Sequence, residues 1–534
     1  SSDVCSSDLT PWMSVGRAGR RFFWNPCSRD RPTPDLILSV FFASGNTNLS
    51  APIDARDQLT VESRSGGALS CEMLHHSRVF PLPGGVIGNT TGFGPVIRGS
   101  SPRRVAIHDA EIDGLAQAME QFSAVILAAG RGTRMCSALP KVLHPILGIP
   151  MLEHVSRQVR AAGADDLSVV VGHGSDQIRQ NLEGTPVRTA LQDPQRGTGH
   201  ALLEALNQCP PRHSTLVVIN GDLPDLDDQM IRQLVETHRG QGEALTMVIA
   251  DVENPEGMGR VILENAQKSG STDSIRQIVE QSDLDPGAPE NHCVNLGMYA
   301  LDPARILPIL RPMVEEDLSD DDPGRESYLT RLVEVLHGAG MGVCGWNCGV
   351  SAQFAQVNDR RQLAQVSRTM QEKWQHHWMD RGVTIVDPLT TWIEVDVQIG
   401  QDTVIHPNTV IRRGVQVGER CEIGPFAHLR AGTVLEDEVI VGDFVEVNRT
   451  RMETGSKAKH LAYLGDSQVG ANANIGAGAV IANYDGQNKH ATEIGEGAFI
   501  GSGSVVVAPG KIGAEATVAA GALVPPGKSV DAGT

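Results

Sequence analysis

Aliphatic residues recur at every sixth position through the C-terminal part of the chain. The series starts at Ile393, continues without a miss to Val447, and returns from Val469 and again from Ile494. Residues at this spacing can all point into one narrow core while the chain turns between them, which is the pattern of a parallel β-helix of stacked hexapeptide repeats. The composition suits this fold, because the 534 residues include 57 glycines for turns and only 4% aromatic residues. We therefore predict a β-helix domain over residues 383–534.

The phase of this repeat breaks twice. The step from Val447 to Val469 is four residues longer than three repeats, and the step from Ile481 to Ile494 is one residue longer than two. We interpret both breaks as loops that interrupt the β-helix, and such loops commonly carry functional residues. The first of them contains His460.

A phosphate-binding pattern lies upstream of the repeat. Residues 123–130, Ser-Ala-Val-Ile-Leu-Ala-Ala-Gly, form a short apolar run typical of a buried strand, and a glycine-rich turn with Arg134 and Lys141 follows. Glycines let backbone N–H groups approach an anion closely, and the two cations supply charge. The turn is neither a Walker motif nor a complete dinucleotide fingerprint, but it favours an anion site over a plain turn.

Strand-like and helix-like segments alternate through the rest of this region. An amphipathic segment at 151–162 is followed by apolar runs at 167–171 and 216–219, and Asp222 closely follows the last run. This order predicts an α/β domain with an open, mostly parallel, Rossmann-like sheet that binds ligands beyond the carboxyl ends of its strands. At such an end Asp222 could hold Mg²⁺, which takes few carboxylates plus substrate oxygens, or it could cap a turn.

We expect four parts along the chain. Residues 1–118 lack lysine and sustained periodicity, and the first nine resemble a translated sequencing adapter, so we expect a non-native or disordered leader before a start at Met119; a transit peptide is the alternative. The α/β domain would span 119–357. A linker helix with apolar residues at three- and four-residue steps would span 358–382 as a strut, before the β-helix domain.

Seven motifs then carry a resemblance to a known family. They are LAAGRGTRM, LPKVLH, LQDPQRGTGHA, NGDLP, GMGRV, IVEQSD and VNLGMY, in that order. Together they resemble the sugar-1-phosphate nucleotidyltransferases, and specifically the bifunctional N-acetylglucosamine-1-phosphate uridyltransferase/glucosamine-1-phosphate acetyltransferase family, over about residues 121 to 525. This resemblance implies a left-handed β-helix, a homotrimer with active sites between subunits, and a role in peptidoglycan and lipopolysaccharide synthesis. The implied substrates are glucosamine 1-phosphate, acetyl-CoA, N-acetylglucosamine 1-phosphate and UTP, with Mg²⁺ as cofactor.

The resemblance also implies a uridyltransferase site. Arg134 and Lys141 would stabilise the phosphates during catalysis, and Asp222 and Asn358 would bind Mg²⁺. Residues that would hold the uridine nucleotide are Leu127, Ala128, Ala129, Gly130, Gln192, Gly197 and Thr198, and those that would hold the N-acetylglucosamine moiety are Gly259, Glu280 and Asn295.

For the acetyltransferase, the resemblance implies that His460 is the general base that deprotonates the amine of glucosamine 1-phosphate. Arg430 and Lys489 would hold the sugar phosphate. Other residues would contact the polar groups of the sugar, namely Tyr463, Asn474 and Asn483, or line the acetyl-CoA site, namely Ala477, Tyr484, Ser502 and Ala520.

The chain departs from the family pattern at several positions. Asn448 replaces the second phosphate-binding lysine, with Arg449 beside it, and the sequence stops at Thr534 without the usual basic tail. These departures favour an alternative in which only the uridyltransferase works. Asn220, where the family often has tyrosine, and Arg331, where an acid is common, are expected to be peripheral. A non-catalytic nucleotide-sugar-binding scaffold and a thymidylyltransferase are further alternatives.

The charge and the cysteines limit the partners and the compartment. The net charge is −19 and there is no basic tract, which argues against a nucleic-acid groove or an anionic membrane surface. No apolar stretch is long enough to span a bilayer. The nine mostly isolated cysteines are typical of a reducing compartment, so we expect a cytoplasmic protein.

Overall fold

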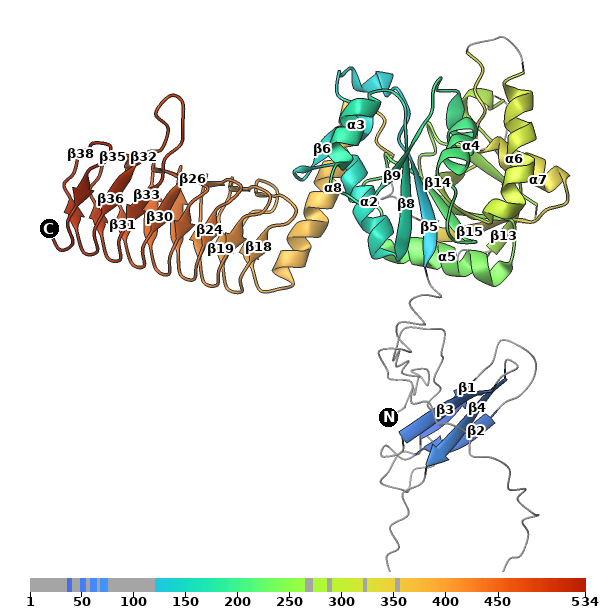
Figure 1. Cartoon of the computed structure of the whole chain (residues 1–534), viewed down its shortest axis with the longest axis horizontal. Helices are drawn as coiled ribbons and strands as arrows, with labels where there is room; N and C mark the ends of the chain where they lie inside the picture. The colour runs from blue at the N-terminus through green and yellow to red at the C-terminus, as the bar shows by residue number, and fades with distance from the viewer. Residues whose placement is uncertain are drawn as a thin grey trace, which may run out of the picture. The chain divides into compact units, whose positions relative to one another are not determined.

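A computed structural model of the chain describes residues 121–264, 272–285, 291–319, 324–350 and 356–534, and four strands nearer the N-terminus (Figure 1). The chain divides into two compact units between Glu120 and Gln121. In the first unit, β1 (Leu36–Val40) pairs with β2 (Leu49–Ile53), and β3 (Gln58–Arg64) pairs with β4 (Ala68–Leu74), both antiparallel. The rest of the expected leader lies outside the described residues. The domain boundaries given above therefore stay predictions.

The second unit begins with a nine-stranded sheet, in the order β11-β15-β13-β12-β14-β10-β5-β8-β9. Its parallel part consists of β5 (Phe122–Leu127), β8 (Ala164–Val171), β9 (Arg188–Leu191) and β10 (Leu216–Asn220). The strands predicted at 123–130, 167–171 and 216–219 correspond to β5, β8 and β10. The other part holds β11 (Leu245–Asp251), β12 (Arg260–Leu263), β13 (Thr272–Val279), β14 (Cys293–Leu301) and β15 (Val343–Val350), and β14 runs antiparallel to β10 and β11.

Helices cover both faces of this sheet, so the domain has three layers (Figure 1). One apolar core joins the sheet to α4 (Gly197–Gln208), α6 (Pro303–Asp317) and α7 (Arg331–Gly338). A second core joins the opposite face to α2 (Met151–Ala161), α3 (Ser175–Leu182) and α5 (Asp228–Gln241). The prediction of a Rossmann-like α/β domain is confirmed.

The parallel register brings two turns together at one edge of the sheet. Leu127 of β5 lies beside Asn220 of β10, and the Gly221 N–H donates to the Leu127 carbonyl oxygen at 2.9 Å. The glycine-rich turn after β5, which includes η1 (Thr133–Met135) and η2 (Lys141–Leu143), therefore meets the turn that carries Asp222. A short hairpin of β6 (Pro145–Ile146) and β7 (Ile149–Pro150) follows η2.

Helix α8 (Arg360–Met379) connects the sheet domain with the β-helix, where a linker helix was predicted. Its first turn is capped by Asp359, whose carboxylate accepts hydrogen bonds from the N–H groups of Arg361 and Gln362. Val366 and Trp374 pack in a small core with residues of the β6–β7 hairpin, and Trp378 packs in the β-helix core. Among the described residues, no helix has the length and apolar content of a membrane span.

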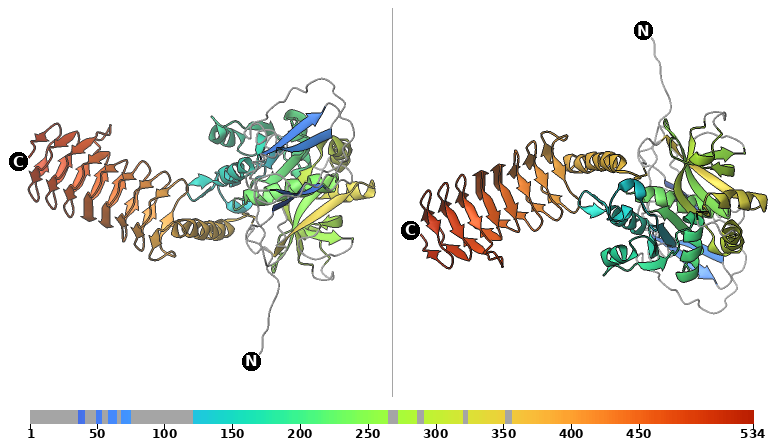
Figure 2. Two further views of the ribbon diagram at one scale, coloured as in Figure 1. Left: turned by 90° about the horizontal axis from the view of Figure 1, so that it is seen from below. Right: turned by 90° about the horizontal axis from the view of Figure 1, so that it is seen from above.

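The C-terminal part is a left-handed parallel β-helix of three sheets with eight short strands each, from β16 (Thr384–Ile385) to β39 (Ser529–Val530). Figure 2 shows its stacked coils. The aliphatic residues predicted to point inward form one continuous core, and Ile393, Ile405, Ile411 and Ile423 have no exposed surface. The hexapeptide prediction is confirmed.

The first predicted interruption is not a loop. Residues 448–468 continue the β-helix through β27 (Arg451–Met452), β28 (Lys457–His460) and β29 (Tyr463–Gly465), with Met452, Ala458 and Leu464 fully buried. These three residues divide the step from Val447 to Val469 into four sides of the β-helix, with lengths of five, six, six and five residues. The prediction had assumed three sides of six residues and a loop. The prediction of a loop was wrong because shortened corners shift the phase without opening the helix, and His460 ends a strand.

The second interruption is a loop, and it is longer than the phase indicated. Strands β32 (Val480–Ala482) and β33 (Thr492–Ile494) lie in different sheets of the same coil, so a single side separates them. Residues 483–491 therefore project from the β-helix between these strands, as Figure 1 shows, and Tyr484 and Lys489 form an antiparallel bridge at the loop base.

Candidate functional site

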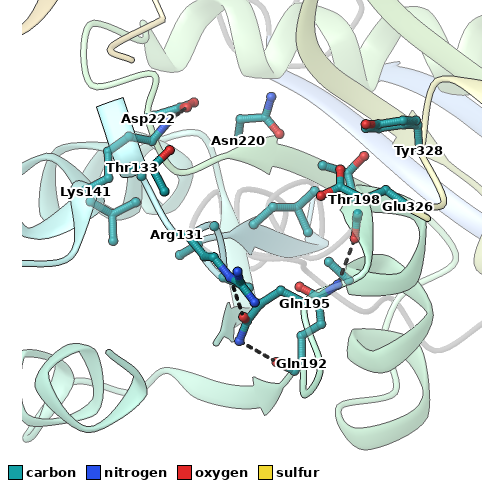
Figure 3. Close-up of a pocket in the computed structure, with 18 of the residues that line it drawn as sticks. Arg131, Thr133, Lys141, Gln192, Gln195, Thr198, Asn220, Asp222, Glu326 and Tyr328 are labelled. Atoms are coloured by element: carbon teal, nitrogen blue, oxygen red, sulfur yellow. Dashed lines mark hydrogen bonds and ion pairs between the residues drawn. The ribbon is translucent and has the colours of Figure 1, made fainter. Parts of the chain in front are cut away.

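Two adjoining pockets open beyond the carboxyl ends of β5 and β10, and Figure 3 shows the first of them. The first has a volume of about 530 Å³ and the second about 360 Å³. They share four lining residues, namely Thr198, Asn220, Tyr328 and Gln356. This is the edge at which an open α/β sheet is expected to bind its ligand.

The residues that the resemblance assigned to the uridyltransferase divide between these pockets. Those assigned to the uridine nucleotide line the first, together with Lys141 and Asp222: Leu127, Ala128, Ala129, Gly130, Gln192, Gly197 and Thr198. Those assigned to the sugar line the second, together with Arg134 and Asn358: Gly259, Glu280 and Asn295. The fold thus brings all the predicted residues of this site together, although their individual roles stay predictions.

The glycine-rich turn needs its glycine at position 132. Gly132 adopts a left-handed conformation with φ +58°, and a Cβ there would lie 2.7 Å from the Cβ of Lys141. Only glycine therefore lets the turn pack directly against the residue that carries the lysine.

Charged and amide groups meet where the two pockets adjoin. The Lys141 ammonium donates to the Asp222 carboxylate at 2.5 Å and to the Asn358 Oδ1 at 3.3 Å. The Arg134 guanidinium donates to the same Asn358 oxygen at 3.1 Å. Two cations and two side-chain oxygen groups thus lie together where the pockets adjoin, which is the kind of charge arrangement that an anion site needs.

The oxygen donors fit a magnesium ion. Asp222 and Asn358 both direct a side-chain oxygen to the Lys141 ammonium, so the two oxygens already converge on one cation. Within the described residues there is no group of three or more His, Cys, Asp or Glu side chains that could hold a metal. Two hard oxygen ligands, completed by substrate oxygens, suit Mg²⁺, which is seldom held by a full protein cage.

The far end of the first pocket is lined by amide groups. The Gln192 Nε2 donates to the Gly197 carbonyl at 2.8 Å, and the Gln195 Nε2 lies 3.4 Å from the Gln192 carbonyl (Figure 3). Gly197 has φ +89°, and a Cβ there would collide with the Ser327 carbonyl. This packing fixes an amide-rich surface that can form hydrogen bonds with a planar base.

The second pocket is built from paired polar groups. The Thr330 hydroxyl donates to Glu280 at 2.7 Å, and the Asn295 Nδ2 donates to the Tyr299 hydroxyl oxygen at 2.6 Å. Burial raises the pKa of Tyr299, so its hydroxyl stays protonated. A Cβ at Gly259 would lie 3.0 Å from an Ile278 methyl group, so a side chain at this position would crowd the neighbouring strand β13.

Two expectations about departures from the family pattern are resolved by the structure. Asn220 is not peripheral, because it lines both pockets at the end of β10. Arg331 does lie outside the lining of both pockets, and it forms ion pairs with Glu316 and Asp317 of α6. The prediction considered only the type of residue at position 220. The position itself lies at the carboxyl end of the parallel strand β10, and this explains why Asn220 lines the pockets.

Gln356 is a further pocket residue that neither the motifs nor the resemblance indicated. Its side-chain Nε2 lies 3.2 Å from each carboxylate oxygen of Asp222. Nothing in the residues around Gln356 indicates this contact except that Asn358 lies two positions later.

On the β-helix, four predicted residues lie along one corner in successive coils. The backbone N–H of Gly478 donates to the His460 carbonyl, that of Gly503 to the Ala477 carbonyl, and that of Gly521 to the Ser502 carbonyl, at 3.1, 2.8 and 2.8 Å. Ala520 immediately precedes Gly521 in the next coil. The corner therefore runs from His460 past residues with short side chains.

His460 itself is accessible. Its side chain is 57% exposed, and its Nδ1 lies 3.7 Å from the Asp443 carboxylate on the preceding coil. Asp443 and His460 are register partners in neighbouring strands, so the pairing is set by the β-helix itself. A carboxylate at this side of the ring can orient an imidazole.

A polar cluster lies beside this corner and is centred on Asp466. Arg449 donates to both carboxylate oxygens of Asp466 at 2.5 and 2.7 Å, and to the Asn448 Oδ1 at 3.0 Å. The Asn483 Nδ2 also donates to Asp466, and the Tyr463 hydroxyl lies 3.4 Å from the Asn483 Oδ1. The guanidinium of Arg449 holds the pKa of Asp466 below its usual value, so the carboxylate stays ionised.

The remaining predicted acetyltransferase residues surround this cluster less closely. Arg430 pairs with Glu446 at 2.8 Å, and Tyr484 and Lys489 lie on the projecting loop, where the Tyr484 hydroxyl donates to the Gly486 carbonyl. Asn474 begins β31 (Asn474–Ile475), beside Lys457 of the preceding coil. Asn474 therefore lies in a different sheet of the β-helix from the strand that carries Tyr463.

Comparison with known proteins agrees with both domains. Residues 124–286 match the MobA-like NTP transferase domain, and residues 396–431 match the bacterial transferase hexapeptide (six repeats). The chain is 38% identical over 434 residues to the bifunctional protein GlmU of Shouchella clausii, an alignment that covers 75% of this chain and 93% of the relative. It is also 38% identical over 441 residues to the bifunctional protein GlmU of Pelobacter propionicus, covering 76% and 94%. With the paired pockets on the sheet domain and the His460 corner on the β-helix, this similarity over both domains places the chain in the family of bifunctional GlmU proteins.

Proposed function

We propose that this protein makes UDP-N-acetylglucosamine in two reactions at two sites. The β-helix transfers an acetyl group from acetyl-CoA to glucosamine 1-phosphate, and the sheet domain transfers a uridyl group from UTP to the N-acetylglucosamine 1-phosphate that results. The observation that carries the proposal is the division of the predicted residues between two adjoining pockets, with Arg134, Lys141 and Asp222 between them. The product would supply peptidoglycan and lipopolysaccharide synthesis in the cytoplasm.

In the uridyl transfer, an oxygen of the sugar phosphate attacks the α-phosphorus of UTP and pyrophosphate leaves. Such a step needs aligned reactants and neutralised charge rather than a covalent nucleophile. The first pocket would bind the nucleotide and the second the sugar, so that the sugar phosphate faces the α-phosphorus at their junction. Lys141 and Arg134 would stabilise the charge that develops there.

Asp222 and Asn358 would hold a magnesium ion at this junction. When bound, the ion would neutralise charge on the phosphates of the nucleotide. Lys141, which contacts both residues in the structure, would then be free to turn its ammonium toward the same phosphates.

In the acetyl transfer, His460 would accept a proton from the amine of glucosamine 1-phosphate, and the amine nitrogen would attack the thioester carbon of acetyl-CoA. The coenzyme leaves as a thiol. The exposed imidazole and the neighbouring Asp443 support this role, because a general base must reach its substrate and be held in orientation. The corner that passes Ala477, Ser502 and Ala520 would receive the coenzyme.

We further propose that three copies of the β-helix complete the acetyltransferase site. Phe426, Phe444 and Leu461 are 47%, 57% and 64% exposed, and the rings of Phe426 and Phe444 stack with centroids 4.8 Å apart. These three residues, here called the apolar stripe, lie at the same corner as His460 in three successive coils. Large apolar side chains gathered on one face are typical of an interface, and a second copy of the β-helix would cover them.

A second candidate function is uridyl transfer alone, and the geometry of Arg449 favours it. Arg449 was a possible substitute for the missing phosphate-binding lysine at position 448, but Asp466 and Asn448 already accept its hydrogen bonds. Asn448 is 5% exposed and carries no charge. The sugar phosphate would then rely on Arg430 and Lys489.

An assay of the purified protein with glucosamine 1-phosphate, acetyl-CoA and UTP separates these functions. Formation of both N-acetylglucosamine 1-phosphate and UDP-N-acetylglucosamine is expected. If only ready-made N-acetylglucosamine 1-phosphate is converted, the uridyltransferase acts alone. A faster reaction with dTTP than with UTP would identify a thymidylyltransferase. Binding of the nucleotide sugar without turnover would indicate a non-catalytic scaffold.

A further inference from the structure

We infer that Gln356 is a positioning residue that holds the Asp222 carboxylate in place for uridyl transfer. Its Nε2 lies 3.2 Å from both carboxylate oxygens, so one amide group spans the carboxylate. This inference rests on the proposed uridyltransferase site, in which Asp222 and Asn358 hold the metal. It adds a residue that neither the motifs nor the resemblance assigned.

The local backbone explains how Gln356 reaches Asp222. Residues 356–358 directly precede α8, and the side chains of Gln356 and Asn358 both reach the candidate site, where they contact Asp222 and Lys141. Val357 points the other way and is fully buried in the core beside α8. Its backbone N–H donates to the Asp222 carbonyl at 3.0 Å, which fixes the two segments against each other.

The C-terminal side of this segment is also fixed. The Asn358 N–H donates to the Gln362 Oε1 at 2.7 Å, and Asp359 caps α8. Further along the helix, the Lys373 ammonium donates to both carboxylate oxygens of Asp225, at 2.8 and 2.7 Å. The turn from Asp222 to Asp225 is therefore held at both ends by groups in and before α8, so Gln356 acts from a rigid support.

The geometry gives Gln356 a specific effect on the carboxylate. Asp222 accepts from Gln356 on one side and from Lys141 on the other, so its plane cannot rotate freely. A neutral amide donor orients the carboxylate without neutralising it, and the charge stays available to a cation. Groups that orient metal ligands in this way typically change metal affinity or activity by about 10- to 100-fold when removed.

The test uses the full chain and Mn²⁺ as a paramagnetic probe for the metal. Mn²⁺ binding is measured by water-proton relaxation in the presence of UDP-N-acetylglucosamine and without pyrophosphate, so that no turnover occurs. Gln356→Met keeps the length of the side chain but removes the donors, and Gln356→Ala removes both. Gln365→Ala, on the exposed side of α8, is the matched control.

We expect both Gln356 variants to bind Mn²⁺ about 10- to 100-fold more weakly than the parent, with the Gln365 control unchanged. The Mg²⁺ concentration that gives half-maximal uridyl transfer should rise by a similar factor, while the KM for UTP at saturating Mg²⁺ changes less than about threefold. Acetyl transfer and the melting temperature of Gln356→Met should match the parent.

Two results would overturn the inference in distinguishable ways. If the parent binds Mn²⁺ and Asp222→Ala does not, but Gln356→Met binds like the parent, then Gln356 has no positioning role and the proposed site survives. If the parent and Asp222→Ala bind Mn²⁺ equally, the metal site at Asp222 is wrong and the role of Gln356 fails with it.

Discussion

At the scale of single residues, Lys141 tests the separation of the two activities. Lys141→Ala should lower uridyl transfer by about 10²- to 10³-fold, because the variant lacks the ammonium group that would stabilise the charge of the transition state at the junction of the pockets. Acetyl transfer should be nearly unchanged, because His460 lies in the other domain. Steady-state rates for each half-reaction check this, with the surface variant Lys511→Ala as control. Equal loss of both activities would contradict the two-site proposal.

His460 gives the complementary residue-scale test. His460→Ala should reduce acetyl transfer by about 10²- to 10⁴-fold, the usual effect of removing a general base, and leave uridyl transfer to ready-made N-acetylglucosamine 1-phosphate intact. The half-reactions are followed separately with acetyl-CoA and with UTP. His406→Ala, which removes a half-buried β-helix histidine, should acetylate normally. Normal acetylation by the His460 variant would exclude this corner as the active site.

His238 makes the stability of the sheet domain depend on pH. Burial lowers the pKa of His238 to about 4, and its Nδ1 lies 3.1 Å from the Thr246 hydroxyl oxygen. The unfolded chain takes up a proton near pH 6.5 and the folded one only near pH 4, so the free energy of unfolding falls as the pH drops between these values. In His238→Gln, the free energy of unfolding should therefore fall by about 2 kcal/mol less between pH 7 and pH 5 than it does in the parent, as measured by urea unfolding. An unchanged pH dependence would contradict the assignment.

At the scale of elements, the strands that replace the predicted loop can be tested by stability. Leu464 of β29 is fully buried, so Leu464→Ala should lower the free energy of unfolding by about 2–5 kcal/mol through lost burial and a cavity. Leu389→Ala, at a side chain that is 70% exposed, should change it by less than about 0.5 kcal/mol. Urea unfolding of both variants measures the difference. If Leu464→Ala lowers the free energy of unfolding as little as Leu389→Ala does, residues 448–468 would form a loop instead of strands of the β-helix.

At the scale of the whole molecule, the apolar stripe tests the proposed trimer. Phe444→Ser places a hydroxyl where each copy would bury a phenyl ring worth about 1.5–3 kcal/mol, so the assembly should dissociate into single chains. Acetyl transfer should then be lost and uridyl transfer kept. Light scattering after gel filtration measures the mass, and Phe499→Ser, at an exposed ring outside the stripe, is the control. A trimer that persists in the Phe444 variant would exclude the stripe as its interface.

Much of this molecule could be predicted because its patterns are local. A six-residue aliphatic period leaves few folds other than a β-helix, since each coil repeats the same inward position. The apolar run of β5 and the glycine-rich turn after it indicated a phosphate site, because strand, turn and cations are neighbours in the sequence. The family resemblance extended this to residues such as Glu280 and Asn358, which the fold brings to one pocket.

Where predictions failed or said nothing, the deciding contacts join residues that are far apart in the sequence. Between Val447 and Val469 the spacing of inward-pointing residues departs from six. Stacking on neighbouring coils nevertheless keeps Met452, Ala458 and Leu464 buried. Asn220 became a pocket residue because β10 ends beside β5.

Gln356 shows the same limit most clearly. It contacts Asp222 across 134 positions, through a segment anchored by a buried valine and the cap of α8. The sequence by itself determined the two folds and the residue types of the site, since periodicity and motif order are properties of neighbouring residues. Only the tertiary structure decided which side chain orients the Asp222 carboxylate, because packing rather than spacing brings the two together.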